Sequence, residues 1–229
     1  MTTLTLDAVT VRRGIGPVIS EVSLTVEAGA VTAVVGPNGA GKTSLLESIS
    51  GIVPVAAGRI SLDGTDVTRL SRRARARLGI VHVEQGRAIF PTLTVRENLG
   101  LTARTPQQLT EALEVFPELQ KRMALAAGLL SGGEQQMLVL ARAFAARPRI
   151  LLIDEMSLGL APVVFQRLLP VIAQLTAAGI GVLLVEQFAQ TALRVSDQAI
   201  VVTSGRVSYR GPAADLLASP DTLHSAYLG

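Results

Sequence analysis

The sequence has no cysteine and no tryptophan, and aromatic residues make up only 3% of its 229 residues. Without cysteine, the chain can form neither a disulfide framework nor a thiolate metal site. The formal net charge is +3, but so few aromatic residues leave little to stack on nucleic-acid bases. We therefore expect no nucleic-acid partner.

Long apolar runs are also missing. The best, from Gly179 to Val185, spans seven residues and ends at Glu186, whereas a membrane-spanning helix needs about 20. The N-terminal segment lacks the basic region and apolar core of a signal peptide. Yet 48% of the residues are hydrophobic and 17% charged, which predicts a sizeable core and an apolar surface that faces a partner.

Hydrophobic patterns predict an α/β fold with a parallel sheet, because strands alternate with helices. Half-buried strands are expected at 3–11 and 17–27, buried strands at 31–35, 150–153 and 181–185, a strand and turn at 58–64, and a hairpin at 199–209. Helices are expected at 44–49, from about 130 to 145, and at 163–177. From Gly86 to about Ala127 the pattern indicates a helical insertion.

Five arginines occur between residues 69 and 77 (Arg69, Arg72, Arg73, Arg75 and Arg77). They could contact a polyanion or form the solvated face of a helix, and we favour the second interpretation.

The segment GPNGAGKT, Gly36 to Thr43, matches the phosphate-binding pattern G-x-x-x-x-G-K-[ST] between a buried strand and a helix start. Its glycines allow backbone N–H groups to turn toward phosphates, and the helix N-terminus adds positive potential. Lys42 would reach the β- and γ-phosphates, and the Thr43 hydroxyl would bind Mg²⁺. The candidate nucleotide ligands here are Gly36, Pro37, Asn38, Gly39, Ala40, Gly41, Lys42, Thr43 and Ser44.

Two acids, Asp154 and Glu155, follow the buried strand 150–153. Open α/β sheets bind ligands at this end of their strands. Asp154 is the candidate Mg²⁺ holder, and Glu155, expected on the other face, the candidate to orient water or accept its proton.

The segment LSGGEQQ, Leu130 to Gln136, opens a helix. Ser131 and Glu134 fit a capping box, which alone would make this a capped helix and nothing more. However, Gly132 and Gly133 cost stability in a first turn, which suggests that a phosphate approaches the backbone closely. That nucleotide could belong to a second subunit.

Together, GPNGAGKT, LSGGEQQ and ILLIDE resemble the Walker A, signature and Walker B motifs of ABC-transporter ATP-binding subunits. Finer features (GRAIFPTLTVRENL, SLGLAP and LLVEQ) resemble the high-affinity branched-chain amino-acid type, the LivF type. The resemblance implies a P-loop NTPase fold with a RecA-like core plus an antiparallel β-subdomain in 1–85 and 148–229, and a helical subdomain in 86–147.

The resemblance also implies function and partners. ATP with Mg²⁺ would lie between Lys42 of one subunit and Ser131, Gly132, Gly133 and Glu134 of a second, head-to-tail ATPase. Two integral-membrane permease subunits and, indirectly, a solute-binding protein would complete an amino-acid importer, with this chain peripheral on the cytoplasmic face. Gln85 would contact Mg²⁺ and the attacking water.

The sequence departs from the family at three positions. Arg13 stands where an aromatic residue usually stacks on adenine, so either it stacks or it is solvated. Gln187 replaces the switch histidine and can still hydrogen-bond a γ-phosphate. Met156 replaces the usual proline, which we expect to loosen residues 157–160, while His82 and His224 are expected to be structural.

Three alternatives stay open at this point. One is a soluble ABC ATPase outside transport, in assembly or nucleic-acid work; another is an ATPase for amide or urea uptake. The third is a partner that binds nucleotide without hydrolysing it.

Overall fold

Two β-sheets frame the molecule in the computed structural model, which describes residues 2–86 and 88–228. The antiparallel sheet has the order β2-β1-β4-β5, and the six-stranded sheet has the order β10-β9-β3-β8-β7-β6. All strands of the second sheet are parallel except β10. The strands are β1 (Thr3–Arg13), β2 (Gly16–Glu27), β3 (Val31–Val35), β4 (Val55–Leu62), β5 (Thr65–Asp66), β6 (Ile80–Val83), β7 (Ile150–Asp154), β8 (Gly181–Val185), β9 (Gln198–Thr203) and β10 (Arg206–Pro212).

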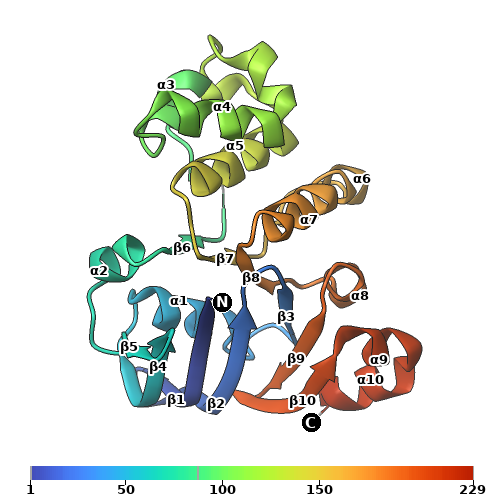
Figure 1. The fold of residues 1–229 in the computed structure, drawn as a ribbon. Helices are drawn as coiled ribbons and strands as arrows, with labels where there is room; N and C mark the ends of the chain where they lie inside the picture. The colour runs from blue at the N-terminus through green and yellow to red at the C-terminus, as the bar shows by residue number, and fades with distance from the viewer. Residues whose placement is uncertain (1, 87, 229) are drawn as a thin grey trace.

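Helices lie on both sides of the six-stranded sheet, as Figure 1 shows. They are α1 (Lys42–Ser50), α2 (Arg72–Arg77), α3 (Val95–Gly100), α4 (Pro106–Val115), the 3₁₀ helices η1 (Pro117–Arg122) and η2 (Ala127–Leu129), α5 (Gly132–Ala145), α6 (Pro162–Gln166), α7 (Leu169–Ala177), α8 (Ala189–Arg194), α9 (Ala213–Ala218) and α10 (Pro220–Leu228). The elements from α3 to α5 form a helical layer at the top of the view. Its predicted limits, 86 and 147, stay a prediction.

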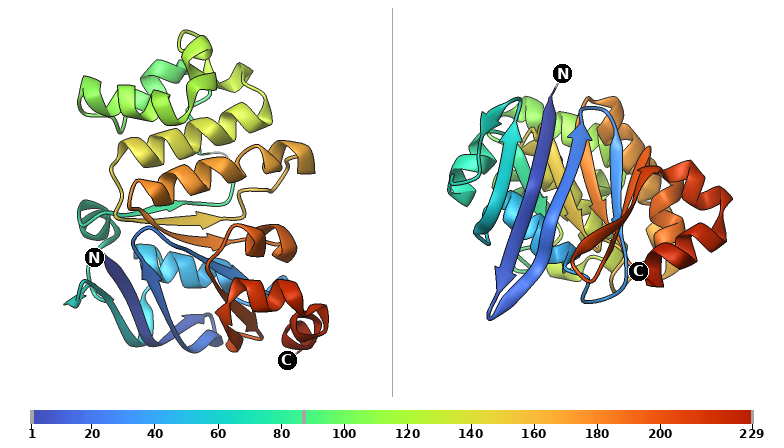
Figure 2. Two further views of the ribbon diagram at one scale, coloured as in Figure 1. Left: turned by 45° about the vertical axis from the view of Figure 1, so that its right-hand side comes forward. Right: turned by 90° about the horizontal axis from the view of Figure 1, so that it is seen from below.

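The layers stack in a fixed order (Figure 2, left): the helical layer, α7, the parallel sheet, α1 and the antiparallel sheet. Two apolar clusters hold them together, one on each face of the parallel sheet. Val31, Ala33 and Val35 pack toward the helical side, and Val34 packs toward α1 and the antiparallel sheet. Burial on both faces explains why β3 is apolar at every position except Thr32.

Most predicted elements are confirmed. The strands β3 and β8 have the predicted bounds, α5 ends at Ala145, and β9 and β10 form the predicted hairpin. The single helix predicted at 163–177 is wrong, because α6 and α7 are separate. Pro170 lies in the first turn of α7, where a residue without an amide proton is tolerated, so the chain starts a new helix there.

The arginine run is only partly a solvated helix face. Arg72 pairs with Glu84 at the surface, but Arg75 is buried. The Arg75 guanidinium donates hydrogen bonds to the carbonyl oxygens of Ser48 and Ile49 at the end of α1. This arginine therefore satisfies carbonyl groups that the helix terminus leaves open.

Candidate functional site

The loop between β3 and α1 requires glycine for steric reasons. Gly36 has φ 150°, and a Cβ there would lie 2.0 Å from the Val202 carbonyl oxygen; at Gly41, with φ 99°, it would lie 2.3 Å from that of Val18. Gly39 also has a positive φ, 78°, but faces open space. Two glycines thus let the loop pack closely against the sheets, and the third lies at its open tip.

The first turn of α1 has no side-chain cap and no acidic residue. Its free N–H groups and the positive end of the helix dipole therefore remain available to an anion. Asn38 and Gly39 are exposed at the loop tip, whereas Ala40 is buried in the apolar cluster below. Of the predicted loop ligands, Ala40 therefore contributes packing through its side chain, and only its backbone is available to a ligand.

Lys42 folds back into this loop. Its Nζ donates hydrogen bonds to the carbonyl oxygens of Gly36, at 2.8 Å, and Pro37, at 2.9 Å. The side chain is buried, which lowers the pKa of its ammonium, while the charges of Glu155 and Asp154 oppose that shift. A buried cation held by neutral carbonyl groups is well placed to exchange them for phosphate oxygens.

Asp154 ends β7 as a buried acid. Among the described residues, neither of its carboxylate oxygens has a hydrogen-bond partner. Burial raises its pKa to about 6, with the Thr43 hydroxyl and the Lys42 charge acting against that change. An unpaired buried carboxylate beside a hydroxyl suits a hard divalent cation such as Mg²⁺, which prefers one or two protein oxygens plus water and phosphate.

Glu155 and Gln85 meet across the strand ends. Gln85 Nε2 donates to Glu155 Oε2 at 3.0 Å. Both line a cavity of about 460 Å³, together with Val18, Asn38, Gly39, Gly41, Lys42, Thr43, Ser44, Leu158 and Gln187. The structure thus gathers most of the predicted catalytic and phosphate-binding residues around one space.

The expectation that Glu155 lies on the opposite face from Asp154 rests on strand alternation and stays a prediction. Strand alternation stops at Asp154, because Glu155 takes the left-handed conformation, with φ 45°. Its amide donates to the Val185 carbonyl at 2.9 Å. The turn therefore directs Glu155 into the cavity that Thr43 lines.

The start of α5 forms a second, separate surface. Ser131 is its exposed N-cap, and the capping box is confirmed: Ser131 Oγ accepts from the Glu134 amide, and Glu134 Oε2 accepts from the Ser131 amide at 2.9 Å. The other Glu134 oxygen accepts from Arg122 Nε at 2.9 Å. A Cβ at Gly133 would lie 2.5 Å from Val164 Cγ1, so this glycine also permits close helix packing.

Ser131, Gly132, Gly133 and Glu134 line a cavity of about 580 Å³ with Gly159, Leu160 and Arg167 among others. None of the described residues that line it also lines the Lys42 cavity. Within one chain, the structure therefore does not bring Ser131 and Lys42 to a common space.

The comparison with protein families settles the family. Residues 19–157 match the ABC transporter family model. The chain belongs to the ABC transporter ATP-binding family. It is an ABC ATPase.

Similar proteins cover nearly the whole ABC ATPase. It is 39% identical to the high-affinity branched-chain amino acid transport ATP-binding protein BraG of Pseudomonas aeruginosa, covering 99% of each chain. It is 40% identical to the probable branched-chain amino acid transport ATP-binding protein LivF of Archaeoglobus fulgidus, over 87% of this chain and 88% of that one. A crystal structure of a nucleotide-free ATP-binding cassette matches with TM-score 0.88 and 25% identity, covering 100% of each chain.

Arg13 of the ABC ATPase lies outside the Lys42 cavity. Its guanidinium pairs with Glu47 on α1, and its side chain is about half exposed. Val18, which the sequence analysis did not single out, lines the cavity instead. The ion pair gives Arg13 a role on the protein surface, so stacking on adenine stays a prediction.

The two histidines differ in their surroundings. His82 is half-buried, its Nδ1 lies 3.1 Å from Ser50 Oγ, and burial lowers its pKa to about 4. His224 is exposed and lines a cavity of about 550 Å³ with Gln187, Phe188 and Tyr227. The place of His224 beside Gln187 could not be predicted from a sequence pattern, because only the tertiary fold brings α10 to this cavity.

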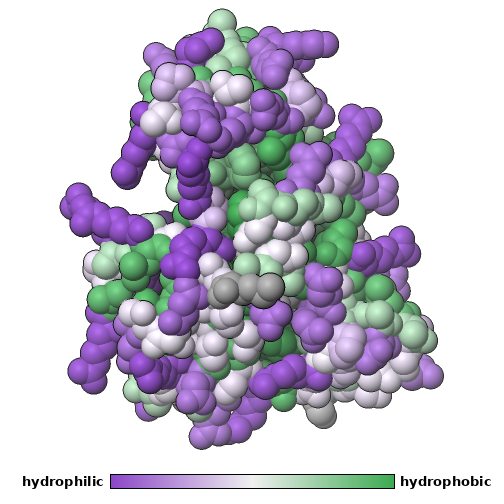
Figure 3. All heavy atoms as spheres, viewed as in Figure 1, coloured by the Kyte–Doolittle hydropathy of each residue, from purple (hydrophilic) through white to green (hydrophobic). Residues whose placement is uncertain are grey.

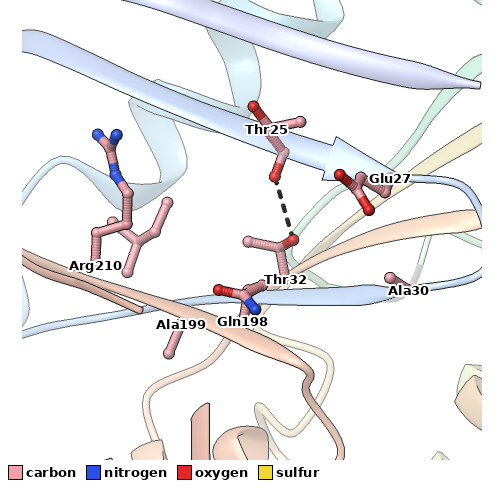
Figure 4. Close-up of a pocket in the computed structure, with 8 residues that line it drawn as sticks. Thr25, Glu27, Ala30, Thr32, Gln198, Ala199 and Arg210 are labelled. Atoms are coloured by element: carbon pink, nitrogen blue, oxygen red, sulfur yellow. Dashed lines mark hydrogen bonds between the residues drawn. The ribbon is translucent and has the colours of Figure 1, made fainter. Parts of the chain in front are cut away.

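A further cavity, of about 250 Å³, lies between the two sheets (Figure 4). Thr25 and Glu27 line it from β2, and Thr32, Gln198 and Arg210 line it from the other sheet. The Thr32 hydroxyl donates to the Thr25 carbonyl at 3.4 Å. This space holds none of the predicted site residues and belongs to the packing between the sheets.

The surface is mixed in polarity. Hydrophilic side chains cover most of the helical layer on the face in Figure 3. Among the described residues, no helix is both long and apolar enough to cross a membrane. Exposed large apolar side chains include Phe90, Leu129, Leu158 and Phe188.

Proposed function

We propose that this ABC ATPase energises the uptake of branched-chain or related small amino acids. The support comes from BraG and LivF, whose names state branched-chain amino acid transport and which match nearly the whole chain. In the proposal, two integral-membrane permease subunits form the pathway and an extracytoplasmic solute-binding protein delivers the amino acid. The ATPase lies peripherally on the cytoplasmic face of the membrane.

ATP binds at the glycine loop in this proposal. The N–H groups of the loop and of the α1 first turn hold the phosphates, and Lys42 turns from its two carbonyl partners toward the γ-phosphate. Thr43, Asp154 and Gln85 hold Mg²⁺, which neutralises phosphate charge when bound. The unpaired Asp154 carboxylate supports this assignment, since such a group is costly without a cation.

Glu155 orients the attacking water and accepts its proton. Gln85, hydrogen-bonded to it at 3.0 Å, keeps the carboxylate at the cavity wall. Gln187 donates its amide to the γ-phosphate, a role that needs no positive charge. These groups act in a closed site from which water is excluded.

The separation of the two cavities supports the part of the proposal that pairs two ATPase subunits. In one chain the exposed Ser131 helix start and the Lys42 loop line different spaces, so neither encloses a nucleotide by itself. A second ATPase subunit, identical or different, placed head-to-tail would set its Ser131 over the phosphates held by Lys42. The dimer would then supply the donors that a single chain lacks.

Substitution of Lys42 tests the proposal. In the assembled transporter, Lys42→Ala should lower ATP hydrolysis at least about 100-fold, because it removes the charge on the β- and γ-phosphates. Lys121→Ala is the matched control, since Lys121 is the only other lysine and lies exposed on η1. Hydrolysis and amino-acid uptake are measured together in proteoliposomes.

The competing functions give different results. Robust hydrolysis without permease subunits, and co-purification of nucleic acid or an assembly scaffold, would support a non-transport ATPase. Uptake of an amide or urea instead of an amino acid would change the transported substrate and leave the proposed ATPase role as it is. ATP binding without any hydrolysis in the assembled complex would indicate a silent partner.

A further inference from the structure

We infer that Glu186 is a positioning residue that fixes the catalytic turn at Glu155 by clamping Ser157. This inference rests on the proposed role of Glu155. Glu186 follows β8 directly, and Ser157 lies two residues after Glu155. The clamp therefore joins the ends of two neighbouring strands.

Both Glu186 oxygens are engaged. The Ser157 amide donates to Oε1 at 3.1 Å, and the Ser157 hydroxyl donates to Oε2 in a short hydrogen bond. Glu186 is completely buried and Ser157 is nearly so. Because two separate donors hold the two oxygens, the clamp restricts both the position and the rotation of Ser157.

The turn it holds is unusual. Glu155 has a positive φ of 45°, a conformation that costs free energy for a residue with a side chain and persists only where its surroundings impose it. On one side, the Glu155 amide is bonded to the Val185 carbonyl at 2.9 Å. On the other, the Glu186–Ser157 clamp fixes the chain. The turn that carries Glu155 is thus anchored by two successive residues, Val185 and Glu186.

Met156 lies between Glu155 and Ser157. Proline at this position would restrict the turn through its ring, but methionine leaves φ free. We expected Met156 to loosen residues 157–160. Met156 is buried and two hydrogen bonds hold Ser157, so the expected loosening does not apply to Ser157.

Burying the charged form of the Glu186 carboxylate costs free energy. Burial raises the pKa of Glu186 to about 7, because its charge has been taken from water, although the Ser157 bonds act against the shift. Leu158 and Gln187, the residues adjacent to the clamp pair, both line the Lys42 cavity. A buried acid whose chain neighbours line the site is well placed to control geometry there.

Substitutions at both ends of the clamp test the inference in the assembled transporter. Ser157→Ala removes the hydroxyl donor, and Glu186→Leu removes both acceptor oxygens while keeping a side chain of similar size. Each should lower kcat about tenfold or more with KM for ATP within about twofold, because ATP still binds the intact loop. Ser157→Thr keeps the hydroxyl and should stay within about threefold of the parent.

Ser196→Ala serves as the control, since Ser196 Oγ makes a single bond to the Ala192 carbonyl outside the site. The inference is overturned if Ser157→Ala and Glu186→Leu keep the parental kcat. It is equally overturned if each variant that lowers kcat also has an altered KM for ATP and a lower thermal midpoint. The same holds if Ser157→Thr loses as much kcat as Ser157→Ala. If the parent transporter itself hydrolyses no ATP, the proposed function has failed instead.

Discussion

At the scale of single residues, this ABC ATPase contains two buried acids with raised pKa values. Asp154 ends β7 and Glu186 directly follows the neighbouring β8; both are almost inaccessible to solvent, and burial raises the pKa of both. They differ in their partners among the described residues: Asp154 has only the nearby Thr43 hydroxyl, which opposes the rise of its pKa, whereas Glu186 holds Ser157 through two hydrogen bonds. Asp154 is suited to a cation, and Glu186 to a structural restraint.

Glu186 predicts a pH dependence of stability. Its folded-state pKa of about 7 exceeds its ordinary value of 4.5, so the folded chain binds the proton more tightly than the unfolded chain. The resulting stability is present below about pH 4.5 and is lost as pH rises through 7, by at most about 3 kcal/mol. Glu155 faces Glu186 as a negative neighbour and acts in the same direction.

Denaturant unfolding of the nucleotide-free chain at pH 5 and pH 8 measures this effect. Glu186→Gln should lose less stability than the parent between these values, because the amide does not titrate. Equal losses for parent and variant would show that Glu186 does not carry the dependence.

At the scale of elements, short buried strands were the easiest to predict. β3 and β8 are short, mostly apolar segments rich in β-branched or aliphatic residues and flanked by glycine or polar residues, as expected for strands between two apolar layers. The phosphate loop was also predictable, because its glycine-lysine motif stands between a buried strand and a helix start. The break between α6 and α7 was not, since a proline in a first turn is compatible with one helix or two.

The site was less predictable where it depends on tertiary contacts. The direction of Glu155 depends on a positive φ that strand alternation does not indicate. Arg13 found a partner in Glu47, 34 residues away, and Val18 reached the cavity from β2. The Ser157–Glu186 contact joins two strand ends that no local pattern connects.

Gly133 gives a prediction for the packing of α5 against α6. Gly133→Ala should destabilise the chain by about 1–2 kcal/mol, because overpacking against Val164 outweighs the gain in helix propensity. Combining it with Val164→Ala should recover part of that loss beyond the sum of the single effects. Urea unfolding of the four proteins measures the coupling, and a stabilised Gly133→Ala would refute close packing as the reason for glycine.

At the scale of the whole molecule, the proposed function assigns one chain two halves of a nucleotide site that do not meet. The glycine loop, Gln85 and Glu155 line one cavity, and the capped start of α5 lines another. The family to which the chain belongs is that of transporter ATP-binding subunits. A second subunit is the simplest physical way to complete both halves at once.

Cross-linking across the proposed nucleotide site tests this directly. The chain has no cysteine, so Asn38→Cys and Ser131→Cys can be combined in a Glu155→Gln background without other thiols. Where the transporter pairs this chain with a different ATPase, that companion carries the equivalent cysteines. Under mild oxidation, Mg-ATP should yield disulfide-linked ATPase pairs, and Mg-ADP should not. Subunits that retain ATP yet never cross-link would contradict a nucleotide held between two ATPases.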